Sequence, residues 1–233
     1  MTMIDHVRLY AASAKLDIKK FTVFVEGTGD VEYFRIAAQL ELAAGGPNLL
    51  GDEFAIVAAG EKDKGGVDGL RRQMTTFHAL SSTYLKPNGA EAYRFLALFD
   101  NDMAGRRAKA AAMVMDASMV EFRDVLCLHP ILKPAVGDAA AIGRAIARDN
   151  EGFRDIDWEI EDMLSPDFVC AFLEEHPSAL IKMKTSIGGH IHRELTRDGK
   201  ARLLAYAREN AIREDVSSLV TALRGLRCYT GVR

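Results

Sequence analysis

Cysteine is scarce in this chain of 233 residues, which contains only Cys127, Cys170 and Cys228. Because these cysteines are odd in number and far apart, they predict no disulfide framework, zinc ribbon or thioredoxin-type redox pair. No apolar run approaches the roughly 18 residues that cross a membrane. Charged residues also interrupt the first 20 positions, where a signal peptide needs an apolar stretch. We therefore expect a cytoplasmic protein with reduced thiols and no membrane partner.

The chain also lacks the glycine patterns of the common nucleotide sites. Residues 65–73 read GGVDGLRRQ, without the G-x-G-x-x-G fingerprint or the Gly-Lys-Ser/Thr of a phosphate loop. There are no internal repeats or low-complexity tracts. Hydrophobic residues make up 48% and charged residues 27% of the chain. A globular chain of this length and composition can bury a core without disulfides.

Charge is distributed unevenly along the chain, although the net charge is only −3. Residues 181–233 contain 11 Lys and Arg against 5 Asp and Glu, whereas residues 1–180 contain 19 against 28. An acidic body with a basic tail would suit a metal site beside a surface that binds a polyanion. A solvated helix face is the simpler interpretation of the same asymmetry.

The first two thirds of the chain alternate between strand-like and helix-like segments. Apolar, β-branched runs at 21–27, 53–60, 93–100 and 124–132 predict strands, and the segments 30–44, 67–82 and 103–118 predict helices. Near-continuous apolar runs indicate strands that are buried on both faces. We therefore predict an α/β fold whose mainly parallel sheet has helices on both faces.

The pattern changes after residue 150, where the chain is predicted to be helical to its end, including 190–209 and 212–225. We expect a sheet domain over residues 1–160, with its core at 20–132. Residues 161–233 would then form a helical extension that carries an acidic motif and the basic tail.

The first candidate motif is EGTGD, in which Glu26 ends the first predicted strand and Asp30 opens the next helix. Ligands of open parallel sheets bind beyond the carboxyl ends of the strands. These two acids are therefore candidates for a site, although Asp30 would also favour the helix N-terminus without any function.

The second candidate motif is LFDNDMAG, in which a buried strand runs directly into Asp100 and Asp102. If the strand continues to residue 102, both carboxylates point to one side. Two like charges held so close favour a cation between them, and carboxylates are the usual anchors of Mg²⁺. Gly105 would allow close approach of the backbone or a substrate.

Together, VFVEGTGDVEYF and LALFDNDMAG resemble the two acidic motifs of the TOPRIM domain, and the resemblance covers roughly residues 20–132. It implies a doubly wound sheet whose acids bind Mg²⁺ or Mn²⁺ and act on phosphodiester bonds of nucleic acid. The chain has no room for a topoisomerase tyrosine domain and lacks the cysteines of a primase zinc module. The resemblance is therefore to the nucleases of the OLD (overcoming lysogenization defect) family and to small defence-associated TOPRIM nucleases.

The same resemblance implies a later acid for a second metal and a later lysine. WEIEDML supplies Glu159, Glu161 and Asp162, of which Glu161 is favoured, and IKMKTSIGGH supplies Lys182 and Lys184, of which Lys184 is favoured. The chain lacks the ATPase domain of full OLD proteins, so control by ATP would need a separate partner. A role as a toxic effector in phage defence is implied by the resemblance alone.

Two metal ions about 4 Å apart can activate a water and stabilise the leaving oxygen. The predicted metal ligands are Glu26, Asp30, Asp100, Asp102 and Glu161, and a lysine would neutralise charge on the phosphate. Arg106, Arg107 and Lys182 are candidates for contacts with nucleic acid, DNA or RNA. His190 and His192 are expected to diverge on a helix and not to bind metal.

Two other functions remain open at this point. The protein could be a TOPRIM module that binds nucleic acid or a protein partner without catalysis. The Asp-x-Asp also resembles the nucleophile site of haloacid-dehalogenase phosphatases, which usually carry it on the first strand, whereas here it follows the third.

Overall fold

The computed structural model describes residues 4–60 and 65–232. Four strands form one sheet, β1 (Phe21–Val25), β2 (Phe54–Ala58), β3 (Arg94–Phe99) and β4 (Val125–Cys127), in the order β2-β1-β3-β4. Every pairing in this sheet is parallel. The predicted parallel sheet is therefore confirmed. The polar loop expected after β2 lies partly outside the described residues, at 61–64.

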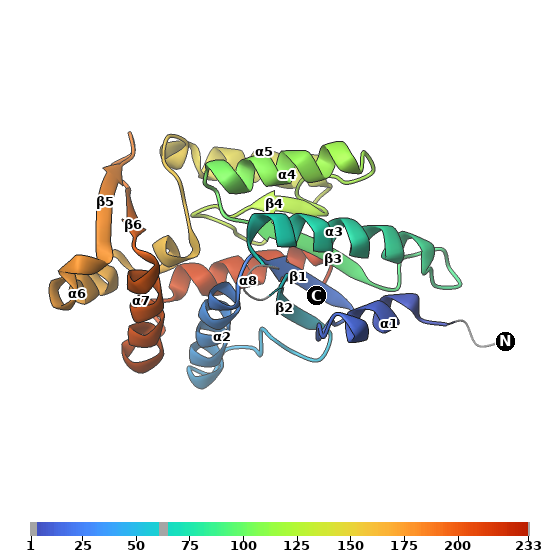
Figure 1. The fold of residues 1–233 in the computed structure, drawn as a ribbon, viewed down its shortest axis with the longest axis horizontal. Helices are drawn as coiled ribbons and strands as arrows, with labels where there is room; N and C mark the ends of the chain where they lie inside the picture. Colours follow the sequence, from blue (N-terminus) through green and yellow to red (C-terminus); the bar gives the residue numbers. More distant parts are fainter. Residues whose placement is uncertain (1–3, 61–64, 233) are drawn as a thin grey trace.

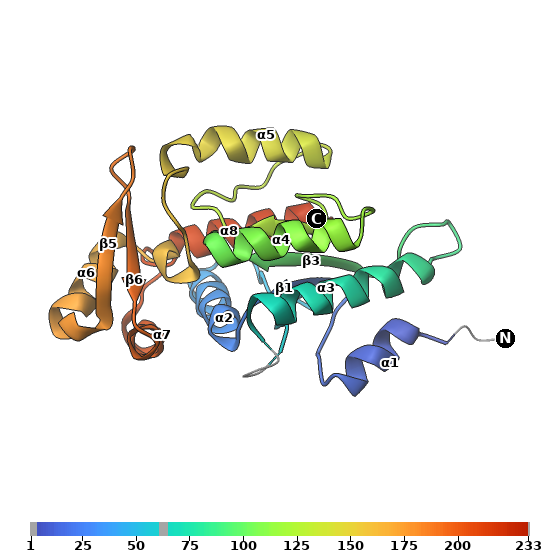
Figure 2. The same cartoon turned by 45° about the horizontal axis from the view of Figure 1, so that its top comes forward.

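Helices cover both faces of the sheet, as the buried strands predicted (Figures 1 and 2). One face packs against α2 (Thr28–Ala43) and α8 (Ser217–Thr230), and the other against α1 (His6–Ser13), α3 (Gly66–Thr83) and α4 (Met103–Met115). β1 is buried between these layers, with Val23 and Val25 in one hydrophobic cluster and Phe24 in the other. The sheet is thus a central layer, as predicted for an α/β fold.

After β4 the chain leaves the sheet, and its last helix returns to pack against the sheet. It contains α5 (Ala139–Asp149), α6 (Pro166–Glu175), α7 (Arg197–Asn210) and the short 3-10 helices η2 (Glu151–Phe153), η3 (Ile160–Met163) and η4 (Pro177–Ala179). α8 then returns to pack on α2, β1 and β3. The segment 161–233 and the sheet consequently share one hydrophobic cluster.

The helix predicted over 190–209 is wrong in its first part. Two antiparallel strands, β5 (Leu180–Thr185) and β6 (Ile191–Leu195), form a hairpin, and α7 begins only at Arg197. The sequence of β5 alternates apolar and polar residues, which is the period of a strand. Gly189, with φ of 80°, supplies the turn between the strands. The hairpin extends beside α6 and away from the main sheet (Figure 1).

Candidate active site

The order of the strands places a topological switch point where β1 and β3 end. From β1 the chain crosses to β2 on one side, with α2 on one face, and then to β3 on the other side of β1, with α3 on the opposite face. Adjacent connections that leave toward opposite faces open a gap at the carboxyl edge of the sheet. Glu26 follows β1 directly and Asp100 follows β3 directly, so both predicted acids lie at this switch point.

Glu26 is held against the end of β3 by a hydrogen bond. Its Oε1 accepts from the backbone N–H of Asp100 at 3.2 Å. Burial raises the pKa of Glu26 to about 7, with further upward contributions from Asp30 and Asp102. The N–H of Asp100 and the ammonium of Lys200 act in the opposite direction. Glu26 is therefore a carboxyl group that gains a proton easily in the absence of a further cation.

Asp30 and Asp100 belong to the same cluster of charges. Asp30 lies in the first turn of α2, where its Oδ2 accepts from the N–H of Gly27 at 2.8 Å. Burial raises the pKa of Asp30 to about 6. Burial also raises the pKa of Asp100 well above its usual value, and Asp30 and Glu26 add to this shift. Such mutual effects require carboxylates that are close together in a poorly hydrated site.

A backbone bridge brings the third acidic motif to the same place. The N–H of Asn101 donates to the carbonyl of Trp158 at 2.9 Å, and the N–H of Trp158 donates to the carbonyl of Asn101 at 3.2 Å. Glu161, on η3 just after this bridge, is only 8% exposed. Burial raises the pKa of Glu161 to about 7. Glu161, which the sequence analysis favours among the acids of WEIEDML, thus lies with Glu26, Asp30 and Asp100 in one cluster.

Lys200 is the cation of this cluster, and sequence reasoning missed it. It lies in the first turn of α7, and its Nζ is 2.8 Å from Oε2 of Glu159 and 3.6 Å from Oε2 of Glu161. Burial disfavours its charged form, but Glu161 and Glu159 outweigh burial, and the pKa of Lys200 is raised. Lys200 therefore stays charged. Besides Glu159 and Glu161, two further carboxylates interact with it electrostatically: Asp100 raises the pKa of Lys200, and Lys200 acts to lower the pKa of Asp30.

Two oxygens in this region have no hydrogen-bond partner among the described residues. They are Oε2 of Glu161 and the hydroxyl of Tyr33, and both are buried. Burial raises the pKa of Tyr33, and Glu161 and Asp30 raise it further, so the phenol lies close to these acids. Buried polar atoms without hydrogen bonds are uncommon in folded proteins, and an oxygen of this kind is free to accept a bond from an ion or a water.

Asp102 differs from the other acids in its role. The strand ends at Phe99, so the condition under which Asp100 and Asp102 would point to one side is not met. Instead, Asp102 is the N-cap of α4, and its Oδ1 accepts from the N–H of Gly105 at 2.6 Å. A Cβ on Gly105 would lie 2.1 Å from the carbonyl oxygen of Asp100, so this glycine permits a close backbone approach.

Asp162 organises the segment that carries Glu159 and Glu161. Its Oδ2 accepts from the N–H of Glu159 at 3.0 Å and lies 2.7 Å from Nδ1 of His192. Its Oδ1 accepts from the N–H of Arg193 at 3.2 Å. Asp162 thus ties η3 to strand β6, and His192 takes part in this link instead of lying on a helix. The hydrogen bond to Asp162 raises the pKa of His192.

The two lysines predicted from the sequence lie outside the cluster. Lys184 donates to the backbone carbonyl of Asp155, and Lys182 is 2.9 Å from Glu194 across the hairpin. Both lysines are exposed. The lysine that lies beside the acids is instead Lys200.

The predicted phosphate-contacting arginines lie on the exposed side of α4. Arg106 binds the backbone carbonyl of Asn101 and forms an ion pair with Asp157 at 2.8 Å. This contact fixes the loop after β3 to the segment before η3. Arg107 is exposed and has no ion-pair partner within the described part of the chain. Of the two, Arg107 is the better placed to contact a polyanion.

The acids gather around Lys200 without forming a ready set of metal ligands. Within residues 4–60 and 65–232, no three His, Cys, Asp or Glu side chains are positioned together to hold a metal ion. Glu26, Asp100 and Glu161 nevertheless supply the oxygen donors that Mg²⁺ and Mn²⁺ prefer, and Oε2 of Glu161 accepts no hydrogen bond from the described residues. The residues fit a hard divalent cation in their chemistry, and rotation of their side chains would be needed to bind it.

Comparison with known proteins gives no match: no family model, curated protein or solved structure is similar to this chain. The resemblance to the TOPRIM domain thus rests on the two acidic motifs of the sequence alone. Among the helices of the described residues, none combines the length and apolar character that crossing a membrane requires.

Proposed function

We propose that this chain is a metal-dependent nuclease of the TOPRIM type that hydrolyses phosphodiester bonds in DNA or RNA. The observation that carries this proposal is the convergence of Glu26, Asp30, Asp100 and Glu161 from separate elements of the fold. Their pKa values are all raised by burial. Such a cluster costs stability, and proteins retain costly arrangements of this kind mainly at functional sites.

Divalent cations bound by these carboxylates would activate a water and stabilise the leaving oxygen of the phosphodiester. Glu26, Asp30, Asp100 and Glu161 are the proposed ligands. Asp102 supports them indirectly, because it caps α4 and fixes the loop that carries Asp100. Mg²⁺ and Mn²⁺ are equally compatible with an all-oxygen set of donors.

Lys200 is proposed to act on the phosphate. In the metal-free protein its ammonium group offsets part of the negative charge of Glu159 and Glu161. Once cations take over that role, the ammonium can bind an oxygen of the scissile phosphate and stabilise the charge that develops there. The exposed Arg107 and Lys184 would contact backbone phosphates farther along the strand.

The test is cleavage of plasmid DNA, single-stranded DNA and transfer RNA with Mn²⁺, Mg²⁺ or EDTA. We expect cleavage of at least one substrate with metal and none with EDTA. Glu26→Gln and Asp100→Asn should abolish cleavage, whereas Glu53→Gln, at the opposite edge of the sheet, should leave it unchanged. Cleavage at wild-type rates by Glu26→Gln or Asp100→Asn would refute the proposal.

A second candidate function is a TOPRIM-like module that binds nucleic acid or a protein without catalysis. The observation that favours it is the central position of Lys200, which already neutralises part of the acidic cluster without a metal. Under this alternative, no metal and no substrate would yield cleavage, and EDTA would leave binding of nucleic acid unchanged.

The biological setting follows from the resemblance and is part of the same proposal. We place the protein in the cytoplasm, as a toxic effector in phage defence that a separate ATPase restrains. Co-expression with this separate ATPase should then reduce the toxicity of the wild-type chain. Expression of Glu26→Gln without the ATPase should be harmless.

A further inference from the structure

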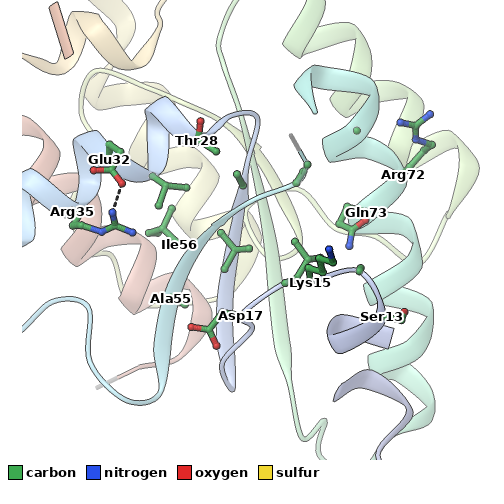
Figure 3. Close-up of a pocket in the computed structure, with 18 residues that line it drawn as sticks. Ser13, Lys15, Asp17, Thr28, Glu32, Arg35, Ala55, Ile56, Arg72 and Gln73 are labelled. Atoms are coloured by element: carbon green, nitrogen blue, oxygen red, sulfur yellow. Dashed lines mark hydrogen bonds and ion pairs between the residues drawn. The ribbon is translucent and has the colours of Figure 1, made fainter. Parts of the chain in front are cut away.

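The free edge of the sheet lies in a groove. β2 is the outermost strand on one side, and a cavity of about 1100 Å³ runs along it (Figure 3). Six consecutive residues, Ala55 to Gly60, line this cavity. Side chains of one strand face would contribute only alternate residues. The groove therefore follows the edge of β2, where the backbone is accessible.

The direction of the backbone groups follows from the pairing with β1. The N–H of Phe21 donates to the carbonyl of Glu53, and the N–H of Ala59 donates to the carbonyl of Val25. Alternate residues of a strand direct their backbone groups to the same side. The groups directed toward β1 are therefore those of Glu53, Ala55, Val57 and Ala59. Ile56 and Ala58 direct theirs away from β1 and into the groove. This edge offers donors and acceptors for a further strand.

The edge lacks the devices that usually prevent strand addition. The sequence of β2, FAIVA, contains no charge and no proline, and β2 pairs in regular register with β1. Edge strands of monomeric proteins are commonly protected by lysine, proline or a bulge. The chain instead surrounds this edge with walls, formed by α2 on one face and by α3 and residues 13–17 on the other.

The walls determine what kind of partner fits. A second copy of this chain would have to bring its own α2 and α3 to the same edge, where they would meet the walls of the first. A single extended segment fits between the walls. Lys15 and Arg72 stand on the same wall and form no ion pair within the described residues, whereas Arg35 on the other wall pairs with Glu32 (Figure 3). Asp17 is the one acid on the wall of Lys15.

We propose that the β2 edge binds an extended, acidic segment of a partner protein as a fifth strand of the sheet. Backbone hydrogen bonds to Ile56 and Ala58 would supply the affinity, as in other cases of strand addition. Alternate side chains of the segment would lie against Val31 and Ile56 on one face and toward Lys15 and Arg72 on the other. This proposal does not depend on nuclease activity.

The test measures binding of a fluorescein-labelled decapeptide of alternating valine and glutamate to the full chain by fluorescence anisotropy. We expect saturable binding with one peptide per chain. Binding should weaken at least tenfold when alternate peptide nitrogens are methylated or when lysine replaces glutamate. It should weaken similarly in Ala58→Pro, which removes one outward N–H, but not in Ala58→Val, which keeps it.

The charge of the groove provides a second set of variants should Ala58→Pro fail to fold. Lys15→Glu with Arg72→Glu should weaken binding at least tenfold, and Arg144→Glu, on the exposed side of α5, should not. Absence of saturable binding, or equal binding of the methylated peptide, would overturn the proposal. Self-association in sedimentation that Ala58→Pro removes would also overturn it, because the occupant would then be a second copy.

Discussion

The role of Lys200 in the acidic cluster leads to a quantitative prediction for Lys200→Met. The ammonium lies 2.8 Å from Glu159 and 3.6 Å from Glu161. At an effective dielectric constant of about 20, these distances correspond to about 6 and about 5 kcal/mol of Coulomb attraction. Desolvation of Lys200 offsets much of this, and its side chain is 34% exposed, which screens the pairs further. A net loss of about 2 kcal/mol is expected at pH 8.

The effect should depend on pH with a definite sign. At pH 5, Glu161 is protonated in the folded protein, because burial raises its pKa to about 7. Lys200 then has less negative charge to balance, and Lys200→Met should cost less than 1 kcal/mol. Urea denaturation followed by circular dichroism, in EDTA at pH 5 and pH 8, measures both values.

Lys182→Met is the matched control, because Lys182 lies 2.9 Å from the carboxylate of Glu194 but its side chain is 67% exposed on the hairpin. Its stability should match that of the wild type at either pH, because solvent screens this ion pair. The reasoning is refuted if Lys200→Met matches this control at pH 8, or if its cost is the same at pH 5 and pH 8.

Three further predictions concern the same region. Stability of the metal-free protein should fall as pH rises from about 4.5 to about 7 and then level off. The reason is that burial raises the pKa of Glu26 to about 7 and that of Asp30 to about 6. Over this range the folded state therefore binds protons that the unfolded state releases. Thermal unfolding across this range in EDTA checks the slope, and a rise in stability would contradict it. Gly105→Ala should destabilise by about 2 kcal/mol or more in urea, while Gly29→Ala, where a Cβ meets nothing within 4 Å, should be neutral or stabilising. Asp162→Ala should cost about 3 kcal/mol by the same assay, because it leaves the partly buried N–H groups of Glu159 and Arg193 without an acceptor. A loss below about 1 kcal/mol would show that these N–H groups have other acceptors.

Much of the sheet domain could be predicted because its signals are local. The strand-like runs correspond to β1–β4, and the acids directly after two of them had to meet once the strands were parallel. The fourth strand is shorter than predicted, with only Val125–Cys127 paired. The run 124–132 is buried for another reason, since Leu128 and Leu132 pack against the helices of one face.

Lys200 could not be identified from the sequence, because its partners lie about 40 residues earlier on η3. Within RDGKARLLAYAREN it resembles any charged residue in the first turn of an amphipathic helix. Its role arises only when Asn101 and Trp158 join and bring Glu159 and Glu161 to the sheet. The cap formed by Asp102 and the hairpin before α7 were missed for different reasons. An N-cap changes the direction of an acid after a strand. The period-two alternation of β5 covers only six residues and lies between segments with helical patterns.

Binding of Mn²⁺ to the metal-free chain, measured by isothermal titration calorimetry at pH 7.5, tests most directly whether the acids around Lys200 are a metal site. We expect saturable binding that Asp100→Asn and Glu161→Gln each weaken at least tenfold. Glu194→Gln, whose side chain pairs with Lys182 on the hairpin, should bind like the wild type. Absence of saturable binding at millimolar Mn²⁺, or wild-type binding by Asp100→Asn and Glu161→Gln, would contradict the account.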